Sequence, residues 1–182
     1  MSPRLNQLRD ELVGWMEQLE EPIHQLKQEV QELAEANEKA SRLMTVPGIG
    51  AMTGLYTVLV LGPVERFSSA KQVVSYVGLD SVESSSDNLH RPRRYGRISK
   101  QGDRQLRWLL IQCATTACQY HPQLSRFYHR LKYRKAWPVV KTAVAHKLLV
   151  CCYVLLRDGI DYAEFVRRGP GLGLPDAGTG LE

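Results

Sequence analysis

The first forty residues place an apolar side chain at alternating spacings of three and four positions. These residues are Leu5, Leu8, Leu12, Trp15, Leu19, Leu26, Val30, Leu33 and Ala40. The spacing is that of a coiled-coil seam, so it predicts a long helix over residues 1–42 that pairs with another helix. Pro22 interrupts the seam, which predicts a kink or two stacked helices at that point.

Apolar positions with a helical period continue in shorter segments, and they predict a compact helical domain over residues 43–168. The expected helix starts are Ser68 or Ser69, Asp103 and Pro138, and the expected helix ends are Gly78 and Gly159. The fold is therefore expected to be all-α. The Gly- and Pro-rich residues 169–182 are expected to form a disordered tail.

A short turn, Pro47-Gly48-Ile49-Gly50, lies between two of the apolar helical segments. It predicts a helix-hairpin-helix-like element, because glycine permits a tight turn and lets a phosphate approach backbone N–H groups at a helix start. Gly48 and Gly50 are therefore candidate phosphate contacts. The alternative is a helix–helix corner with a structural role.

Residues 80–102 show no periodicity and contain the run Ser84-Ser85-Ser86. An irregular segment of this length inside a compact domain is usually functional or disordered. Serine hydroxyls are nucleophiles when a base removes their proton. The alternative is that all three serines belong to a polar loop without chemistry.

Charge is divided sharply along the chain. Residues 90–147 hold fourteen Arg and Lys against one acid, Asp103, a formal charge of +13, whereas residues 1–40 carry four cations and nine acids, a charge of −5. The basic part predicts a polyanionic partner such as DNA, and the acidic part is expected to pair with a helix instead. Candidate phosphate contacts are Arg93, Arg94, Arg97, Lys100, Arg104, Arg107, Lys132, Arg134 and Lys135.

Lys132, Arg134 and Lys135 form a second group of cations, and two aromatic residues, Tyr133 and Trp137, lie beside them in the sequence. Aromatic rings among cations are suited to stacking on nucleobases. The alternative is core packing at a helix junction. His90, also in the basic stretch, is expected to be a solvent-exposed loop residue rather than a base.

The 182 residues, 43% of them hydrophobic, are enough for one core. The four cysteines lack a C-x-x-C spacing, which favours buried reduced thiols over a metal site. We expect no membrane segment, because no apolar run appears long enough for a bilayer and no signal peptide is present, and we expect a cytoplasmic protein.

Six sequence blocks then occur in a fixed order: Met44–Gly50, Arg66–Gln72, Tyr76–Leu79, Ser85–Ser86, Gly96–Asp103 and Leu106–Arg107. Together they resemble the C-terminal domain of the bacterial insertion-sequence 110/116/902 transposases, which are serine-dependent DNA recombinases. The resemblance covers about residues 43–168. It implies a composite enzyme in which an acidic RNase H-like domain precedes a coiled coil and the serine-bearing helical domain.

The resemblance also implies a mechanism and partners. In the family a serine attacks a DNA phosphate and forms a covalent phosphoserine link, and a structured guide RNA selects the DNA. This chain shows no counterpart of the acidic domain, so no metal site or cofactor is expected in it, and Mg²⁺ is expected only in that absent domain. A homo-oligomer is expected to form through the coiled coil.

Alignment of the motifs places the family's serine pair on Ser85 and Ser86, and Ser86 is the preferred nucleophile. Asp87 stands where the family usually has glycine, and about three extra residues precede Gly96. The function expected is DNA strand cleavage and transfer in transposition. The alternative is a catalytically incomplete nucleic-acid-binding fragment or relic of such a transposase.

Overall fold

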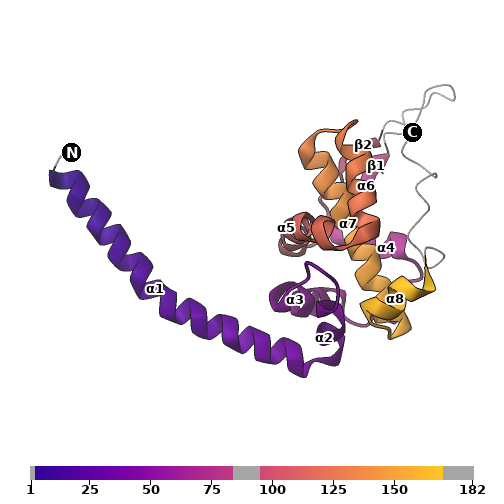
Figure 1. Ribbon diagram of the computed structural model, residues 1–182, viewed down its shortest axis with the longest axis horizontal. Coiled ribbons are helices and arrows are strands. Elements are labelled where there is room, and N and C mark those ends of the chain that lie inside the picture. Colours follow the sequence, from indigo (N-terminus) through magenta and orange to yellow (C-terminus); the bar gives the residue numbers. More distant parts are fainter. Residues whose placement is uncertain (1–2, 84–94, 170–182) are drawn as a thin grey trace.

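The computed structural model describes residues 3–83 and 95–169, in which one long helix leads into a body of shorter helices (Figure 1). The helices are α1 (Pro3–Ala36), α2 (Glu38–Met44), α3 (Ala51–Leu61), α4 (Ala70–Val77), α5 (Arg104–Tyr120), α6 (Pro122–Lys132), α7 (Trp137–Asp158) and α8 (Tyr162–Arg168). A 3-10 turn, η1 (Val64–Arg66), precedes α4. Two short strands, β1 (Ser81–Glu83) and β2 (Tyr95–Ile98), pair antiparallel. The all-α prediction is confirmed apart from this one hairpin.

Helix α1 is continuous through Pro22, so the prediction of two stacked helices is wrong. The missing proline N–H removes one helical hydrogen bond, and an exposed helix accommodates the ring by bending, as the curved ribbon in Figure 1 shows. The first break lies at Asn37 instead. Its backbone is extended (φ −94°, ψ 108°), and its side chain caps the start of α2 by accepting a hydrogen bond of 3.1 Å from the N–H of Ala40.

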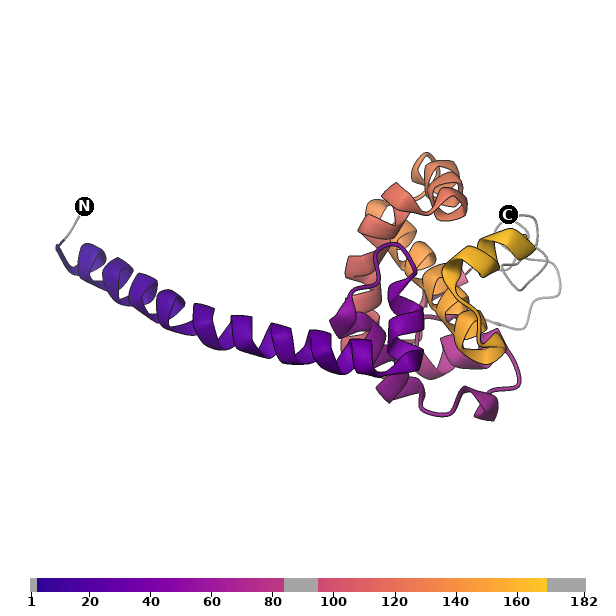
Figure 2. The same cartoon turned by 60° about the horizontal axis from the view of Figure 1, so that its bottom comes forward.

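Most of α1 projects away from the body (Figure 2). It packs against α2 and α3, and its buried residue is Ala34, near its C-terminal end. The seam residues from Leu5 to Leu33 that the structure exposes are accessible over about half of their surface, for example 55% at Leu12 and 56% at Leu19. A narrow apolar stripe on an otherwise polar helix is thus left uncovered by the described part of this chain. Helix α2 belongs to the body, because Ala40 and Leu43 are buried there. Residues 38–42, which the predicted coiled coil of residues 1–42 included, are therefore not part of the projecting helix.

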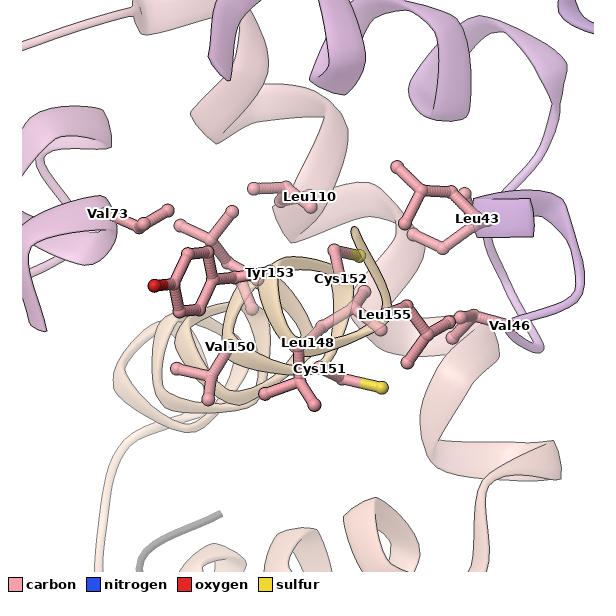
Figure 3. Close-up of a cluster of buried hydrophobic side chains, with 14 of the residues drawn as sticks. Leu43, Val46, Val73, Leu110, Leu148, Val150, Cys151, Cys152, Tyr153 and Leu155 are labelled. Carbon is pink, nitrogen blue, oxygen red and sulfur yellow. The ribbon is translucent and has the colours of Figure 1, made fainter. Parts of the chain in front are cut away.

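Helix α7 occupies the centre of the body and packs against α2, α4, α5 and α6. Figure 3 shows Tyr153 and Val150 of α7 near Val73 of α4, with Leu43 and Val46 on the side of Cys152 and Leu155. The Tyr153 hydroxyl donates a hydrogen bond of 3.0 Å to the Phe67 carbonyl and so connects α7 to the segment before α4.

Helix α7 also corrects an expectation from the sequence. Among the described helices it is the one that is long and apolar enough, by length and composition, to cross a membrane. Of its most apolar stretch, 67% is buried inside the body, as expected for a core helix. The sequence analysis missed this because polar residues such as Lys141 and His146 interrupt the run, although they do not prevent it from being apolar on average.

The local signals at the helix ends are confirmed. Ser69 caps α4 through the N–H of Gln72, and the Asp103 carboxylate accepts a hydrogen bond of 2.6 Å from the N–H of Leu106 at the start of α5. Gly78 and Gly159 end α4 and α7 in the left-handed conformation. Helix α8, capped by Asp161, was not predicted. The predicted tail, from residue 170 on, lies outside the described residues.

The four cysteines are free thiols, as predicted. Cys151 and Cys152 are buried in the core, and Cys113 and Cys118 are partly buried on α5. Burial raises the pKa of Cys118 to about 11 and that of Cys151 to about 12. Both thiols are therefore neutral near pH 7, which suits their apolar surroundings.

His121 joins α5 to α6 and is fully buried. Its Nδ1 accepts a hydrogen bond of 3.5 Å from the Leu124 N–H, and its ring contacts Tyr162 edge-on at 5.0 Å between centroids. Burial lowers the pKa of His121 to about 4, because the interior disfavours a charged imidazolium. The capping interaction therefore requires the neutral ring.

This requirement predicts a pH-dependent stability. Below about pH 6.5 the unfolded chain takes up a proton at His121 that the folded protein excludes, so stability is full above that pH and falls as the pH drops towards about 4. Between about pH 7 and about pH 5 we expect the wild type to lose about 2 kcal/mol more than His121→Asn, which keeps a capping oxygen. Urea unfolding at several pH values measures this difference. His24→Asn on exposed α1 should behave like the wild type; equal pH dependence in wild type and His121→Asn would contradict the assignment.

Candidate nucleic-acid interface

The base of the serine-bearing loop is fixed by a close contact between two glycines and the opposite backbone. Gly78 (φ 78°) and Gly102 (φ 110°) both have the left-handed conformation that favours glycine. A Cβ at Gly78 would overlap the Gln101 carbonyl oxygen, and a Cβ at Gly102 would overlap the Tyr76 carbonyl oxygen. The segments that enter and leave the loop therefore lie in direct backbone contact, and we call residues 76–80 and 98–102 the hairpin neck.

A short antiparallel ladder continues from the neck into the loop. The Ser99 N–H donates a hydrogen bond of 2.9 Å to the Asp80 carbonyl, and Ser81 of β1 lies opposite Ile98 of β2. The sequence of residues 80–102 shows no periodicity, because strands of three and four residues are too short to show an alternating pattern.

The predicted nucleophiles lie beyond this ladder. Ser85 and Ser86 fall within residues 84–94, outside the described residues, as do Asp87, His90, Arg93 and Arg94. Arg97 lies in β2, and its side chain is also outside the described part. The structure shows that the two segments flanking the serine loop, residues 76–80 and 98–102, meet in the hairpin neck.

Arg107 corrects a sequence prediction, because it is buried rather than available to a phosphate. Its guanidinium donates a hydrogen bond of 2.9 Å to the Val77 carbonyl, at the C-terminal end of α4. Arg107 lies on the inner side of α5 beside Leu106 and therefore holds the hairpin neck against this helix. Arg104, near the start of the same helix, remains exposed.

The Pro-Gly-Ile-Gly turn packs against α5, in line with the structural alternative. Gly48 has a φ of 92°, and a Cβ there would lie 2.8 Å from the Ala117 backbone nitrogen. The Gly50 N–H and the Thr53 hydroxyl are both in hydrogen-bond contact with the Cys113 sulfur. A phosphate at Gly48 would have to displace the α5 backbone, so Gly48 serves the packing of this turn on α5. A Cβ at Gly50 would meet no atom within 4 Å, and Gly50 stays a predicted phosphate contact.

Exposed cations gather along α6 and the turn that follows it. They are Arg126, Arg130, Lys132, Arg134 and Lys135. None of these five makes an ion pair with an acid among the described residues. Two of them contact aromatic rings: the Arg130 guanidinium lies 5.7 Å from the Phe127 ring centre, and the Lys132 ammonium lies 5.2 Å from the Tyr133 ring centre. Unpaired cations on one surface attract a polyanion and release counterions when it binds.

Tyr133 is exposed, so the alternative of core packing is wrong for it, whereas Trp137 is half buried at the junction of α6 and α7. Tyr133 is 81% exposed and Trp137 is 48% exposed. Lys141 lies 4.9 Å from the Trp137 ring centre, and Tyr128 meets the same ring edge-on at 5.6 Å. Rings and cations therefore share one surface near the start of α7.

His146 of α7 lies close to the hairpin neck, whereas the neighbouring Lys147 faces α6, where its ammonium lies 4.8 Å from the Phe127 ring centre. Neither was predicted as a site residue. Burial lowers the pKa of His146, while the charge of nearby Asp80 opposes this shift. Burial and the charge of Arg130 lower the pKa of Lys147. Both residues occur inside an apolar helical pattern, where a histidine or lysine gives no sequence signal of its own. Among the described residues, no group of three or more His, Cys, Asp or Glu side chains is arranged to hold a metal ion.

Comparisons with known proteins agree with the motif blocks. A family model described as the transposase IS116/IS110/IS902 family matches residues 40–129. The chain is 29% identical over 152 residues to a pilin gene-inverting protein of Moraxella lacunata, covering 82% of this chain and 46% of that protein. It is 30% identical over 160 residues to a probable family 20 transposase of Pseudomonas aeruginosa, covering 86% and 45% of the two chains.

A third relative is the transposase for insertion sequence element IS1111A of Coxiella burnetii, 31% identical over 114 residues, which covers 63% of this chain and 30% of the relative. The chain thus spans less than half the length of these three relatives.

The neck geometry predicts a large difference between two glycine substitutions. Gly78→Ala is expected to destabilise the protein by more than about 2 kcal/mol, because it adds both left-handed strain and a clash with the Gln101 carbonyl. Gly159→Ala is the matched control: Gly159 has the same left-handed conformation (φ 66°, ψ 28°), and the nearest atom to an added Cβ is a guanidinium nitrogen of Arg42 at 3.9 Å. It should lose only the strain, about 1 kcal/mol. Urea unfolding compares the two, and equal losses would contradict the close contact at the neck.

Proposed function

Because residues 40–129 belong to the IS116/IS110/IS902 transposase family, we propose that this chain forms the DNA-binding, serine-bearing part of a transposase. The observation that supports this most directly is the hairpin neck. It attaches both ends of the serine loop beside α7, on a body whose α6 carries unpaired cations. A nucleophile and a phosphate-binding surface are thereby carried by the same packed helices.

The proposed reaction is a transesterification by Ser86, or by Ser85 if the pair is reversed. The serine hydroxyl loses its proton to a base, and its oxygen forms a bond to a DNA phosphorus. The bond from that phosphorus to one deoxyribose oxygen breaks, and the leaving oxygen takes up a proton. The phosphoserine link conserves the phosphodiester energy, so attack by a free DNA hydroxyl can rejoin strands and release the serine.

The developing charge on the phosphorus oxygens needs neutralisation in such a step. Arg93, Arg94, Arg97 and Lys100 are the cations of the loop and neck that are proposed for this role, since arginine forks grip phosphate oxygens in pairs. Arg107 does not join them, because its guanidinium holds Val77. Its contribution is to position the neck.

The exposed cations of α6 and the following turn are proposed to hold the flanking DNA, with Lys132, Arg134 and Lys135 as phosphate contacts. Such contacts do not depend on sequence and weaken steeply as salt rises. A guide RNA would meet the same surface through the same phosphate chemistry. The Mg²⁺ that the family resemblance implies does not fit the described residues, which hold no suitable ligand cluster, and no step of the proposal passes through it.

Self-association through α1 is the second part of the proposal. Two copies of the exposed apolar stripe would cover each other, as the seam spacing predicts. A second copy is favoured over the basic body as the occupant, because the stripe repeats at coiled-coil spacing along α1 and is flanked by polar residues. Pairing of two copies would bring two serine domains into one assembly.

The serine assignment is tested by trapping. The chain, with and without a separately supplied acidic domain of a relative and Mg²⁺, is incubated with labelled DNA junctions and associated RNA and then denatured. We expect a protein–DNA adduct that Ser86→Ala abolishes while DNA affinity stays within about two-fold, because one hydroxyl contributes little to phosphate binding. Ser84→Ala is the matched control and should keep the adduct.

An adduct that survives Ser86→Ala but disappears with Ser85→Ala would identify Ser85 as the nucleophile. Salt-sensitive DNA binding without an adduct under any of these conditions would favour the alternative function, a nucleic-acid-binding fragment. Affinity that barely changes between about 50 and about 200 mM salt would remove the cations of α6 from the DNA site.

The association of α1 is tested by sedimentation. At micromolar concentration we expect a dimer or larger oligomer, and we expect Leu12→Glu with Leu19→Glu to give monomers, because two charges would be buried in the seam. Gln28→Glu, an exposed position between seam residues, is the control and should still associate. A monomeric wild type would contradict this part of the proposal.

A further inference from the structure

A cavity of about 420 Å³ lies between α5, α6 and α7, away from the hairpin neck. Its lining includes Thr115, Cys118 and Gln119 from α5, Tyr128 from α6, and Trp137 and Lys141 from α7. This volume is within the range of pockets that hold small ligands, about 300–1,000 Å³. No role in the proposed strand transfer uses it.

The aromatic walls of the cavity form a corner. Tyr128 and Trp137 have ring centres 5.6 Å apart and planes inclined by 85°. Trp137 remains 48% exposed, so its ring is accessible from the open side. Two flat walls at a right angle suit a planar ligand, which stacks on one ring and meets the edge of the other.

The charge of the cavity is positive. The Lys141 ammonium lies 4.9 Å from the Trp137 ring centre, and His129 is a further lining residue. Among the described residues that line the cavity there is no acid. Burial raises the pKa of Cys118 to about 11, so its thiol adds no negative charge near pH 7. The ligand that fits is therefore both flat and anionic.

We propose that this cavity binds one unpaired nucleotide of a nucleic acid, with its base on the aromatic corner and its phosphate on Lys141. Lys141 now covers the Trp137 ring, and moving its ammonium to a phosphate would leave that ring face to the base. Gln119 and Thr115 offer hydrogen-bonding groups for the base edge. Because paired bases are covered by their neighbours in the stack, only an unpaired base presents a free face.

The surroundings favour a nucleic acid over an acidic peptide. Lys132, Arg134 and Lys135 lie on the α6 end and the turn that leads to Trp137, where flanking phosphates would continue from the cavity. An acidic peptide would use the cations but not the aromatic corner. This inference rests on the proposed function only because it takes a nucleic acid as the partner. The cavity is a separate binding site for that nucleic acid.

The test measures fluorescence anisotropy of labelled oligonucleotides with the full chain. A duplex with one unpaired nucleotide is compared with its fully paired counterpart, each made as DNA and as RNA. Stacking of one base is worth about 1–3 kcal/mol, so we expect the wild type to prefer the unpaired form by about 5-fold or more. Trp137→Ala and Lys141→Gln are expected to remove this preference and to keep paired-duplex affinity within about three-fold.

Trp108→Ala is the matched control, since Trp108 is 53% exposed on α5 but does not line the cavity, and it should keep the preference. Circular dichroism checks that each variant is folded. If Trp137→Ala does not fold, Lys141→Gln alone tests whether the cavity causes the preference. The DNA and RNA arms identify which nucleic acid supplies the nucleotide.

Two results would overturn the inference: equal wild-type affinity for unpaired and paired forms, or a preference that survives both cavity substitutions. Salt-sensitive binding of the paired duplex alongside either result would leave the proposed DNA-binding function intact. Failure to bind any of the four oligonucleotides would reject the cavity site and the proposed function together.

Discussion

Burial of α7 among α2, α4, α5 and α6 is the interaction on which the rest of the body depends. Leu148, Leu149 and Leu155 are fully buried, and each contributes about 1.5–3 kcal/mol relative to exposure. Helices α2 and α4 are only seven and eight residues long and would not be stable alone. Their position, and with it the hairpin neck at the end of α4, exists because α7 offers them an apolar surface.

The packed body places apolar side chains in its interior and charged side chains on its surface. Apolar side chains and neutral thiols occupy the inside, while cations that pair with no described acid remain on α6 and the turn after it. Arg107 shows that this division is made residue by residue, since one arginine of the same basic stretch is turned inward to support the neck. Clustered positive charge destabilises a fold through self-repulsion, and an extensive apolar core offsets this cost. The core thus allows the fold to carry a surface with a net positive charge.

Sequence reasoning recovered the helices whose ends carry explicit signals. The caps at Ser69 and Asp103 and the stops at Gly78 and Gly159 were read from single residues, because each such residue satisfies a particular backbone group. Of the two alternatives predicted at Pro22, a kink or two stacked helices, the second was wrong, because an exposed helix can bend around a proline. The break lies at Asn37, where the side chain caps a new helix.

The candidate site was less predictable because its features depend on contacts between distant residues. The overlap of Gly78 with Gln101, and the inward turn of Arg107 onto Val77, involve partners that no local pattern connects. The same holds for His146, because the apolar helical pattern around it gives no sign that it lies near Asp80. Composition predicted that the surface charge is positive, but only the packing decides which cations are exposed on that surface.

The length of α1 sets a scale for any assembly of this chain. Its 34 residues rise by about 1.5 Å each, which makes a rod of about 50 Å. If two rods pair in parallel, both bodies lie at the same end and their serine loops can address one locus. If they pair antiparallel, the bodies lie at opposite ends, separated along DNA by about 15 base pairs, or nearly one and a half helical turns. Under the proposed function, the direction of pairing would therefore determine whether two strand exchanges take place on the same or on nearly opposite faces of the double helix.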